Sequence, residues 1–353
     1  MSDAPRDERR LEVPEGFPTE VFVLDAIDGT LLPEAPWTLV GDENVRVHWE
    51  RHGLPQPAGT LWVPTSEKTK RLATLVPWLE TWASVPLNRH ATIVAVGGGV
   101  LTDMGGLAAS LFLRGVTWHS WPTTLLSQVD AGLGGKTGVN LEAGKNLAGA
   151  FHPPARMVAS AEFLTTLSPR HIQAGAWELF KMALIEGDLA WAQALLDADQ
   201  PSSEDLKRSL GLKAGVTHRD FKETGERRLL NLGHTLGHAL ESASNFSLMH
   251  GEAVGLGTLA ACLLAESQGL PAFPDAFLQR FAQRLQPLSD RIAPWGACLP
   301  LLGRDKKATG RNARTGSVEV NCVLPLPGQH ATQRLLPAEA WAPAHARLKA
   351  LLS

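Results

Sequence analysis

The chain has 353 residues, a length that favours two domains and allows a large buried core. Its 33 basic and 36 acidic residues give a net charge of −3, and 44% of the residues are hydrophobic, which argues against disorder and against general binding to nucleic acid or acidic membranes. The three cysteines are unclustered and there is no tyrosine. These counts exclude a disulfide framework, a CxxC metal site and any mechanism that needs a tyrosine acid or base.

The N-terminal residues 1–16 are charged and lack an apolar core, so we expect a flexible tail rather than a signal peptide. The most apolar helical run, residues 253–265, is interrupted by glycine and is shorter than the roughly 20 residues that a membrane span needs. We therefore expect a cytoplasmic protein that binds no membrane.

The first half of the chain alternates strand and helix patterns, which predicts an α/β domain. The run ATIVAV at 91–96 is apolar throughout, as is typical of a parallel strand covered on both faces. Strands are predicted over 20–25, 37–40, 60–63, 91–96 and 117–121, and helices over 68–83 and 100–113.

Three glycines, Gly97 to Gly99, lie between a predicted strand and a predicted helix. Bare backbone N–H groups at a helix N-terminus favour a pyrophosphate, although a tight turn without any ligand explains the same pattern. Asp103 in the first turn of that helix has an equally plain explanation, since an acid there complements the helix dipole.

The segment 122–151 contains two Gly-Lys pairs, at Lys136 and Lys145, with Asn140 and Asn146 nearby. Asp130 precedes the glycine-rich stretch and breaks the P-loop pattern. Lysines beside a flexible backbone suit a phosphate or carboxylate, and the alternative is a basic loop exposed to solvent.

Helical periodicity dominates after Pro169, so we place a domain boundary near residue 165, with an α/β domain over 1–165 and a helical domain over 166–353. Helices are predicted over 172–196, 205–213, 225–243, 251–268 and 276–285, and a short strand over 317–324.

Three histidines close in sequence indicate a catalytic zinc site. The i,i+4 spacing of His234 and His238 nominates these two as joint ligands, and His250 competes with them. Glu178 is also a candidate metal ligand, because it and Lys181 lie among apolar neighbours where a surface ion pair would be unusual.

Arg227 and Asn231 are also spaced i,i+4, so a single helix face is predicted to carry both of them together with His234 and His238. Such a face would bind a carboxylate or phosphate ester near a metal.

Taken together, the motifs resemble the 3-dehydroquinate synthase family of sugar-phosphate cyclases. The resemblance rests on nine elements in family order: GGGVLTD at 97–103, LRG at 113–115, PTTLLSQVD at 122–130, GGKTGVN at 134–140, GKN at 144–146, AGxxExxK at 174–181, NLGHTLGHALE at 231–241, HGEAVGLG at 250–257 and DKK at 305–307.

The resemblance implies a Rossmann-like NAD-binding α/β domain, an all-α metal- and substrate-binding domain, and an active site between them. It implies a homodimer that uses NAD⁺ and Zn²⁺, or Co²⁺, in the shikimate pathway. The implied substrate is 3-deoxy-D-arabino-heptulosonate 7-phosphate, and the products are 3-dehydroquinate and phosphate, formed by transient oxidation, elimination, re-reduction, ring opening and aldol closure.

The resemblance also implies roles for residues, and it overrules the i,i+4 hypothesis by moving His238 to the substrate site. The implied metal ligands are Glu178, His234 and His250. The implied catalytic and substrate residues are Arg114, Lys136, Lys145, Asn146, Lys181, Lys213, Glu223, Arg227, Asn231, His238, Lys306 and Lys307. The implied cofactor-binding residues are Asp42, Glu67, Lys70, Gly98, Gly99, Val100, Asp103, Thr123, Thr124, Asp130, Lys136, Lys145, Phe163, Thr166 and Leu167.

Four positions depart from the family pattern: Ser66, Leu107, His171 and Met182. Three other functions are compatible with the same residues. A related cyclase would make an inosose or valiolone, a polyol dehydrogenase of similar fold would accumulate NADH, and a silent binding module would bind no metal.

Overall fold

The computed structural model describes residues 7–245, 247–302, 308–311 and 318–353. The chain forms two compact units, residues 1–172 with 202–222 and residues 173–201 with 223–353. The expected boundary at 165/166 differs from this division, because residues 202–222 belong to the first unit. Among the described residues, no helix has the length and apolar character needed to cross a membrane.

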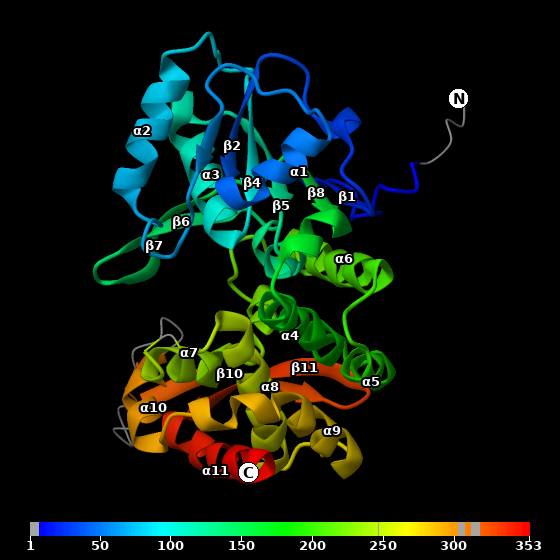
Figure 1. Ribbon diagram of the computed structural model, residues 1–353. Helices are drawn as coiled ribbons and strands as arrows, with labels where there is room; N and C mark the ends of the chain where they lie inside the picture. Colours follow the sequence, from blue (N-terminus) through cyan, green and yellow to red (C-terminus); the bar gives the residue numbers. More distant parts are fainter. Residues whose placement is uncertain (1–6, 246, 303–307, 312–317) are drawn as a thin grey trace. The chain divides into compact units, whose positions relative to one another are not determined.

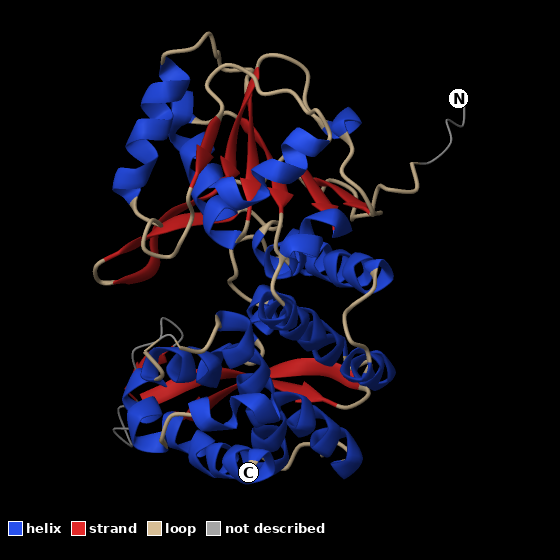
Figure 2. Cartoon of the chain, in the orientation of Figure 1, coloured by secondary structure: helices blue, strands red, loops and turns tan. Residues whose placement is uncertain are grey.

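The first unit is built on a six-stranded parallel sheet of strand order β1-β8-β5-β4-β2-β3 (Figure 2). The strands are β1 (Glu20–Leu24), β2 (Trp37–Asp42), β3 (Leu61–Val63), β4 (Thr92–Gly97), β5 (Thr117–Pro122) and β8 (Arg156–Ser160). The α/β prediction is therefore confirmed, and β8 is the one strand of this sheet that the sequence pattern missed.

Strand β4 is buried on both faces, as its continuous apolar run predicts. Ile93 and Ala95 pack into one core with residues of α2 (Leu72–Ala83) and α3 (Gly99–Leu111). Val94 and Val96 point to the opposite core, which includes Trp49 of α1 (Arg46–Arg51). The alternation of side chains along the strand thus supplies both layers.

Segment 136–151 forms an antiparallel hairpin of β6 (Lys136–Leu141) and β7 (Gly144–Phe151), where the sequence suggested a glycine-rich loop (Figure 1). The glycines explain the difference. A side chain on Gly149 would overlap the backbone of Thr137 on the paired strand, so the two strands meet closely only because this position is bare.

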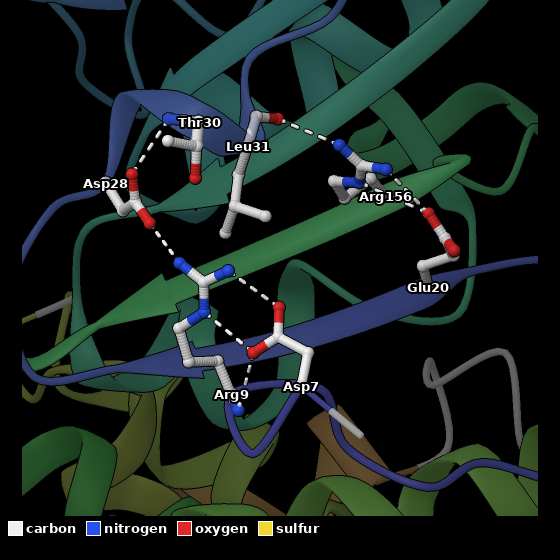
Figure 3. Close-up of polar contacts among 7 residues, drawn as sticks. All are labelled: Asp7, Arg9, Glu20, Asp28, Thr30, Leu31 and Arg156. Carbon is white, nitrogen blue, oxygen red and sulfur yellow. Dashed lines mark hydrogen bonds and ion pairs between the residues drawn. The ribbon is translucent and has the colours of Figure 1, made fainter. Parts of the chain in front are cut away.

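Residues 7–11 also differ from expectation, because they pair with the edge strand β1 instead of forming a flexible tail. The Leu11 N–H donates to the Val21 carbonyl at 2.8 Å, and the Val23 N–H donates to the Arg9 carbonyl at 2.9 Å. The Arg9 guanidinium binds Asp7 and Asp28 (Figure 3). These contacts satisfy an otherwise open sheet edge.

The second unit is mainly helical, and it also contains a three-stranded antiparallel sheet of order β11-β10-β9 that an all-α domain would lack. The helices that belong largely or wholly to this unit are α4 (Pro169–Glu186), α5 (Leu189–Asp197), α7 (His234–Ala243), α8 (His250–Ser267), α9 (Asp275–Leu285), α10 (Trp295–Leu302) and α11 (Trp341–Leu352). The strands are β9 (Ala308–Arg311), β10 (Val318–Leu326) and β11 (Gln329–Pro337).

Helix α6 (Ser203–Arg219) belongs to the first unit. Single turns connect the larger elements of both units: η1 (Gly29–Leu31), η2 (Glu43–Val45), η3 (Phe112–Arg114), η4 (Ser127–Ala131), η5 (Ala161–Thr166), η6 (Glu226–Asn231), η7 (Gln286–Arg291) and η8 (Ala338–Ala340).

Helix α8 is the buried centre of the second unit, and its glycines let neighbouring backbones touch it. A methyl group on Gly251 would overlap the carbonyl oxygen of Ala174 in α4. A methyl group on Gly257 would overlap the carbonyl oxygen of Gly233, just before α7. The bare positions therefore hold α4 and α7 at backbone distance from α8.

We predict that Gly257→Ala lowers the free energy of unfolding by about 1–3 kcal/mol, because the backbone that it meets cannot yield as a side chain would. Gly211→Ala in α6 is the matched control, since no heavy atom apart from its chain neighbours and the backbone of its own helix lies within 4 Å of the added Cβ. Removing a helical glycine there should raise stability by about 0.5–1 kcal/mol. Urea denaturation measures both, and equal stability of the two variants would contradict the packing argument.

Candidate active site

Three histidines and one carboxylate from three helices of the second unit converge. His234 and His238 lie on α7, His250 begins α8, and Glu178 lies on α4. One ring nitrogen of each histidine lies within 4.8 Å of a ring nitrogen of the other two. Glu178 Oε1 lies 3.3 Å from His250 Nε2 and 3.7 Å from His234 Nε2.

These separations fit a metal ion. A tetrahedral zinc with bonds of about 2.0–2.2 Å holds its ligand atoms about 3.4 Å apart. The oxygen–nitrogen distances of 3.3 and 3.7 Å bracket that value. One carboxylate and two imidazoles also match the donor set of catalytic zinc sites that keep a fourth position for substrate.

Two of the histidines are oriented by acceptors behind them. His234 Nδ1 lies 3.0 Å from the Leu232 carbonyl oxygen, and His250 Nδ1 lies 3.2 Å from Glu241 Oε2. An Nδ1–H that donates to these acceptors leaves Nε2 as the metal-binding atom, and Nε2 is the atom that faces Glu178 in both rings.

Glu241 was not predicted as a functional residue. Its signal in the sequence is its position seven residues after His234, which places it on the same face of α7.

Both ligand sets proposed from the sequence are present in this one cluster. The rings of His234 and His238 lie 5.2 Å apart, and those of His234 and His250 lie 5.1 Å apart, measured between centroids. The oriented Nε2 atoms favour Glu178, His234 and His250 as ligands, with His238 beside them.

Glu178 and Lys181 form an ion pair in which the side chains are 0% and 3% exposed. The alternative of an ion pair on a solvated helix face is therefore wrong. Burying two charges costs free energy of folding unless each has partners. A buried ion pair is therefore weak evidence for stability, and this one indicates a functional site.

The carboxylates around His250 outweigh the effect of burial on its pKa. Burial alone would lower the pKa of the imidazole, but the carboxylates of Glu178 and Glu241 raise the pKa to about 9. Without a metal, His250 is therefore protonated at neutral pH, and a metal that binds must displace this proton.

The predicted continuous helix over 225–243 is broken. Residues 226–231 form the separate turn η6, and Gly233 has a φ of +80°, a left-handed conformation that ends any regular helix. Arg227 and Asn231 therefore do not share a helix face with His234 and His238. Asn231 Nδ2 instead donates to Glu223 Oε1 at 2.6 Å, and Arg227 is buried.

The first unit presents its own candidate site at the carboxyl ends of its strands. Strand β2 connects to β3 on one side and β4 connects to β5 on the other, so the direction of the chain reverses between β2 and β4. Ligands bind at such a switch point in open α/β sheets. Asp42 ends β2, and Gly98 and Gly99 follow β4 at the N-terminus of α3.

Buried charges lie close to these glycines. Lys70 Nζ lies 2.5 Å from Asp103 Oδ2 and 2.7 Å from Asn146 Oδ1. Burial raises the pKa of the Asp103 carboxyl to about 6, although the Lys70 ammonium opposes this shift. This cluster therefore offers both hydrogen-bond donors and hydrogen-bond acceptors to a polar ligand.

Lys213 was expected in the helical domain, but α6 carries it in the first unit. Its ammonium donates to the side chain and the backbone carbonyl of Asp130. Burial explains this placement, because Lys213 is 4% exposed and a buried ammonium needs the acceptors that Asp130 supplies.

The other predicted residues of the first unit differ in exposure. Arg114, Lys136, Lys145, Asn146 and Thr166 are exposed, whereas Thr123 and Phe163 are buried. Val100, Thr124 and Leu167 are half-buried. Lys306 and Lys307 lie outside the described residues.

The chain is similar to known proteins in sequence and in fold. The family model of the 3-dehydroquinate synthase N-terminal region matches residues 60–174, and that of the C-terminal region matches residues 175–308. The chain is 45% identical to the 3-dehydroquinate synthase of Methylacidiphilum infernorum over 256 residues, which cover 69% of this chain and 70% of that protein. It is also 45% identical to the synthase of Paracoccus denitrificans over 270 residues, or 72% of this chain and 73% of the relative.

Solved structures of sugar-phosphate cyclases share the fold. A 2-epi-5-epi-valiolone synthase from Streptomyces hygroscopicus, solved with NAD⁺ and Zn²⁺ bound, is 26% identical with a TM-score of 0.74, and the match covers 96% of this chain and 99% of that one. A 2-deoxy-scyllo-inosose synthase with carbaglucose-6-phosphate, NAD⁺ and Co²⁺ is 23% identical with a TM-score of 0.79, covering 96% and 99%.

We predict that Glu178→Ala, His234→Ala and His250→Ala each abolish stoichiometric zinc binding, while His238→Ala retains it, because acceptors at Nδ1 orient Nε2 of His234 and His250 toward Glu178. Elemental analysis of the dialysed variants measures this. Glu266→Ala is the control, since its carboxylate pairs with Arg347 and belongs to no metal-binding cluster of the described residues. Loss of zinc in His238→Ala but not in His250→Ala would favour the ligand pair predicted from i,i+4 spacing.

We further predict that the zinc affinity of the metal-free protein rises between pH 6.5 and about pH 9. The lower limit is the ordinary pKa of an imidazole, and the upper limit is the raised pKa of His250. Below the raised pKa, zinc competes with a bound proton, so affinity should increase about ten-fold per pH unit for one displaced proton. Titration with a chelator-buffered metal series measures the slope. A flat profile would contradict the protonation of His250.

Proposed function

Because this chain belongs to the 3-dehydroquinate synthase family, we propose that it converts 3-deoxy-D-arabino-heptulosonate 7-phosphate into 3-dehydroquinate and phosphate, as a carbon–oxygen lyase that depends on NAD⁺ and a divalent metal. The observation that carries the proposal is the convergence of Glu178, His234 and His250 at ligand distances in a chain of this family.

The proposed reaction needs two cofactors with separate tasks. When bound, Zn²⁺ or Co²⁺ would polarise a substrate hydroxyl, and NAD⁺ would accept a hydride and later return it, so that no net oxidation occurs. For binding NAD⁺ we propose the residues around the β2–β4 switch point, because bare amides at a helix N-terminus favour a pyrophosphate and Asp42 and Asp103 offer acceptors for hydroxyls. The remaining proposed contacts are Glu67, Lys70, Val100, Thr123, Thr124, Asp130, Lys136, Lys145, Phe163, Thr166 and Leu167.

The chain's cations would hold the substrate. Lys181 lies beside Glu178, and Arg227 is buried in the same unit, so each supplies a positive charge in a poorly solvated place where an anion is strongly attracted. We propose that they bind the carboxylate and phosphate together with Asn231, whose amide Glu223 orients. Fixing both anionic ends restricts ring closure to one geometry.

The first unit would contribute further anion contacts from Lys136, Lys145, Asn146 and Lys213, and Arg114 would add a phosphate contact. Lys213 exchanges its Asp130 partner for substrate in this proposal, which keeps the lysine charged and ordered before substrate arrives. His238 would transfer protons, because its imidazole lies beside the metal cluster without being one of the three oriented ligands. A homodimer stays a prediction.

A related cyclase is the second candidate, since the valiolone synthase shares the fold at 26% identity. The 45% identity to two 3-dehydroquinate synthases favours the heptulosonate substrate. An NAD-dependent polyol dehydrogenase would have little use for so many anion-binding groups.

The decisive assay mixes purified protein, catalytic NAD⁺, Zn²⁺ and the heptulosonate phosphate. We expect stoichiometric phosphate release without accumulation of NADH, and Glu178→Ala should lose zinc and turnover together, while Glu266→Ala keeps both. Phosphate release only from other hexose or heptulose phosphates would establish the related cyclase instead, and net NADH would establish a dehydrogenase.

A further inference from the structure

Asn140 occupies an irregular position near the end of β6. The pairing between β6 and β7 shifts register between Val139 and Leu141, so Asn140 leaves the regular ladder opposite residues 145–147 of β7, which form a bulge. Its backbone N–H leaves the hairpin and donates to the Lys70 carbonyl oxygen at 2.8 Å. The bulge in β7 brings Asn146 within hydrogen-bond distance of the Asn140 side chain.

The Asn140 side-chain amide is 8% exposed, and both its nitrogen and its oxygen form hydrogen bonds. Asn140 Nδ2 donates to Glu67 Oε2 at 2.7 Å, and Oδ1 accepts the backbone N–H of Asn146 at 2.9 Å. One side chain thus joins the loop before α2 to the start of β7. A side-chain amide supplies a donor and an acceptor from the same planar group.

Lys70 completes the connection on the other side. Its ammonium donates to the Asn146 side chain at 2.7 Å and to Asp103 at 2.5 Å. Asn146 has a φ of +52°, a conformation that needs support from its surroundings. The hydrogen bonds from Asn140 and Lys70 hold that conformation, and with it the neighbouring Lys145.

We propose that Asn140 is a positioning residue that couples the cofactor-binding segment 67–70 to the substrate-binding segment 145–146. The inference rests on the proposed function, which assigns Glu67 and Lys70 to NAD⁺ and Lys145 and Asn146 to the substrate. Asn140 itself touches neither ligand in this account. It aligns the two segments, so that each ligand meets a site already in its binding conformation.

Three variants separate positioning from a general structural role. Asn140→Ala removes both side-chain contacts. Asn140→Asp keeps the acceptor for the Asn146 N–H but sets a carboxylate against Glu67. Adding Glu67→Gln to Asn140→Asp restores that contact with the donor and acceptor exchanged. Asn321→Ala is the control, because Asn321 makes a comparable amide contact, 3.2 Å to Gln333 Oε1, in the sheet of the second unit.

We expect Asn140→Ala to raise both the KM for the heptulosonate phosphate and the Kd for NAD⁺ about ten-fold, the usual effect of losing a hydrogen bond to a charged group. The kcat should change less than about three-fold, because ground-state alignment is lost while the reacting groups remain. Steady-state kinetics and NAD⁺ titration by intrinsic tryptophan fluorescence measure these constants, and urea denaturation tests whether the variants are folded.

The double variant gives the sharpest outcome. Asn140→Asp with Glu67→Gln should have a lower KM than Asn140→Asp alone, a rescue that a purely structural role does not produce. If the wild type turns over but KM and Kd are unchanged in Asn140→Ala, the inference is overturned and the proposed function stands. The same holds if the wild type turns over but the double variant shows no rescue. Absence of wild-type turnover would overturn the proposed function, and the inference with it.

Discussion

A buried carboxylate organises the second unit. Glu178 is charged and inaccessible to water, so the fold must surround it with cations and imidazoles rather than with apolar side chains. That requirement brings α4, α7 and α8 together at one point. The bare positions Gly251 and Gly257 make the approach possible, because any larger residue would separate these helices by the width of a methyl group.

The first unit also buries charge. Two of its ammonium groups are buried, and acids of the same unit neutralise them, since Asp103 pairs with Lys70 and Asp130 pairs with Lys213. Such pairs keep the ammonium groups ordered in the folded protein. In the proposed function, an anionic ligand replaces an internal partner, which suits a protein of net charge −3.

Both units therefore place polar groups where glycine or a bulge interrupts regular structure. Gly233 directly precedes α7, which begins with His234, and Gly98 caps the N-terminus of α3 beside the switch point. The bulge in β7 lies opposite Asn140, whose backbone N–H bonds to Lys70 outside the hairpin. Regular helices and strands supply rigidity, and their interruptions supply backbone groups that can bind other partners.

Local sequence alone indicated the parallel sheet, most of the long helices and the histidine-rich cluster, because apolar periodicity and a dense histidine motif are short-range signals. It could not reveal the hairpin at 136–151, the break at Gly233 or the place of Lys213 beside Asp130. Each depends on a partner distant in the chain or on a backbone conformation that many local patterns share. Only the tertiary structure decided that His250 meets Glu178, since a contact across 72 residues is fixed by packing and not by spacing.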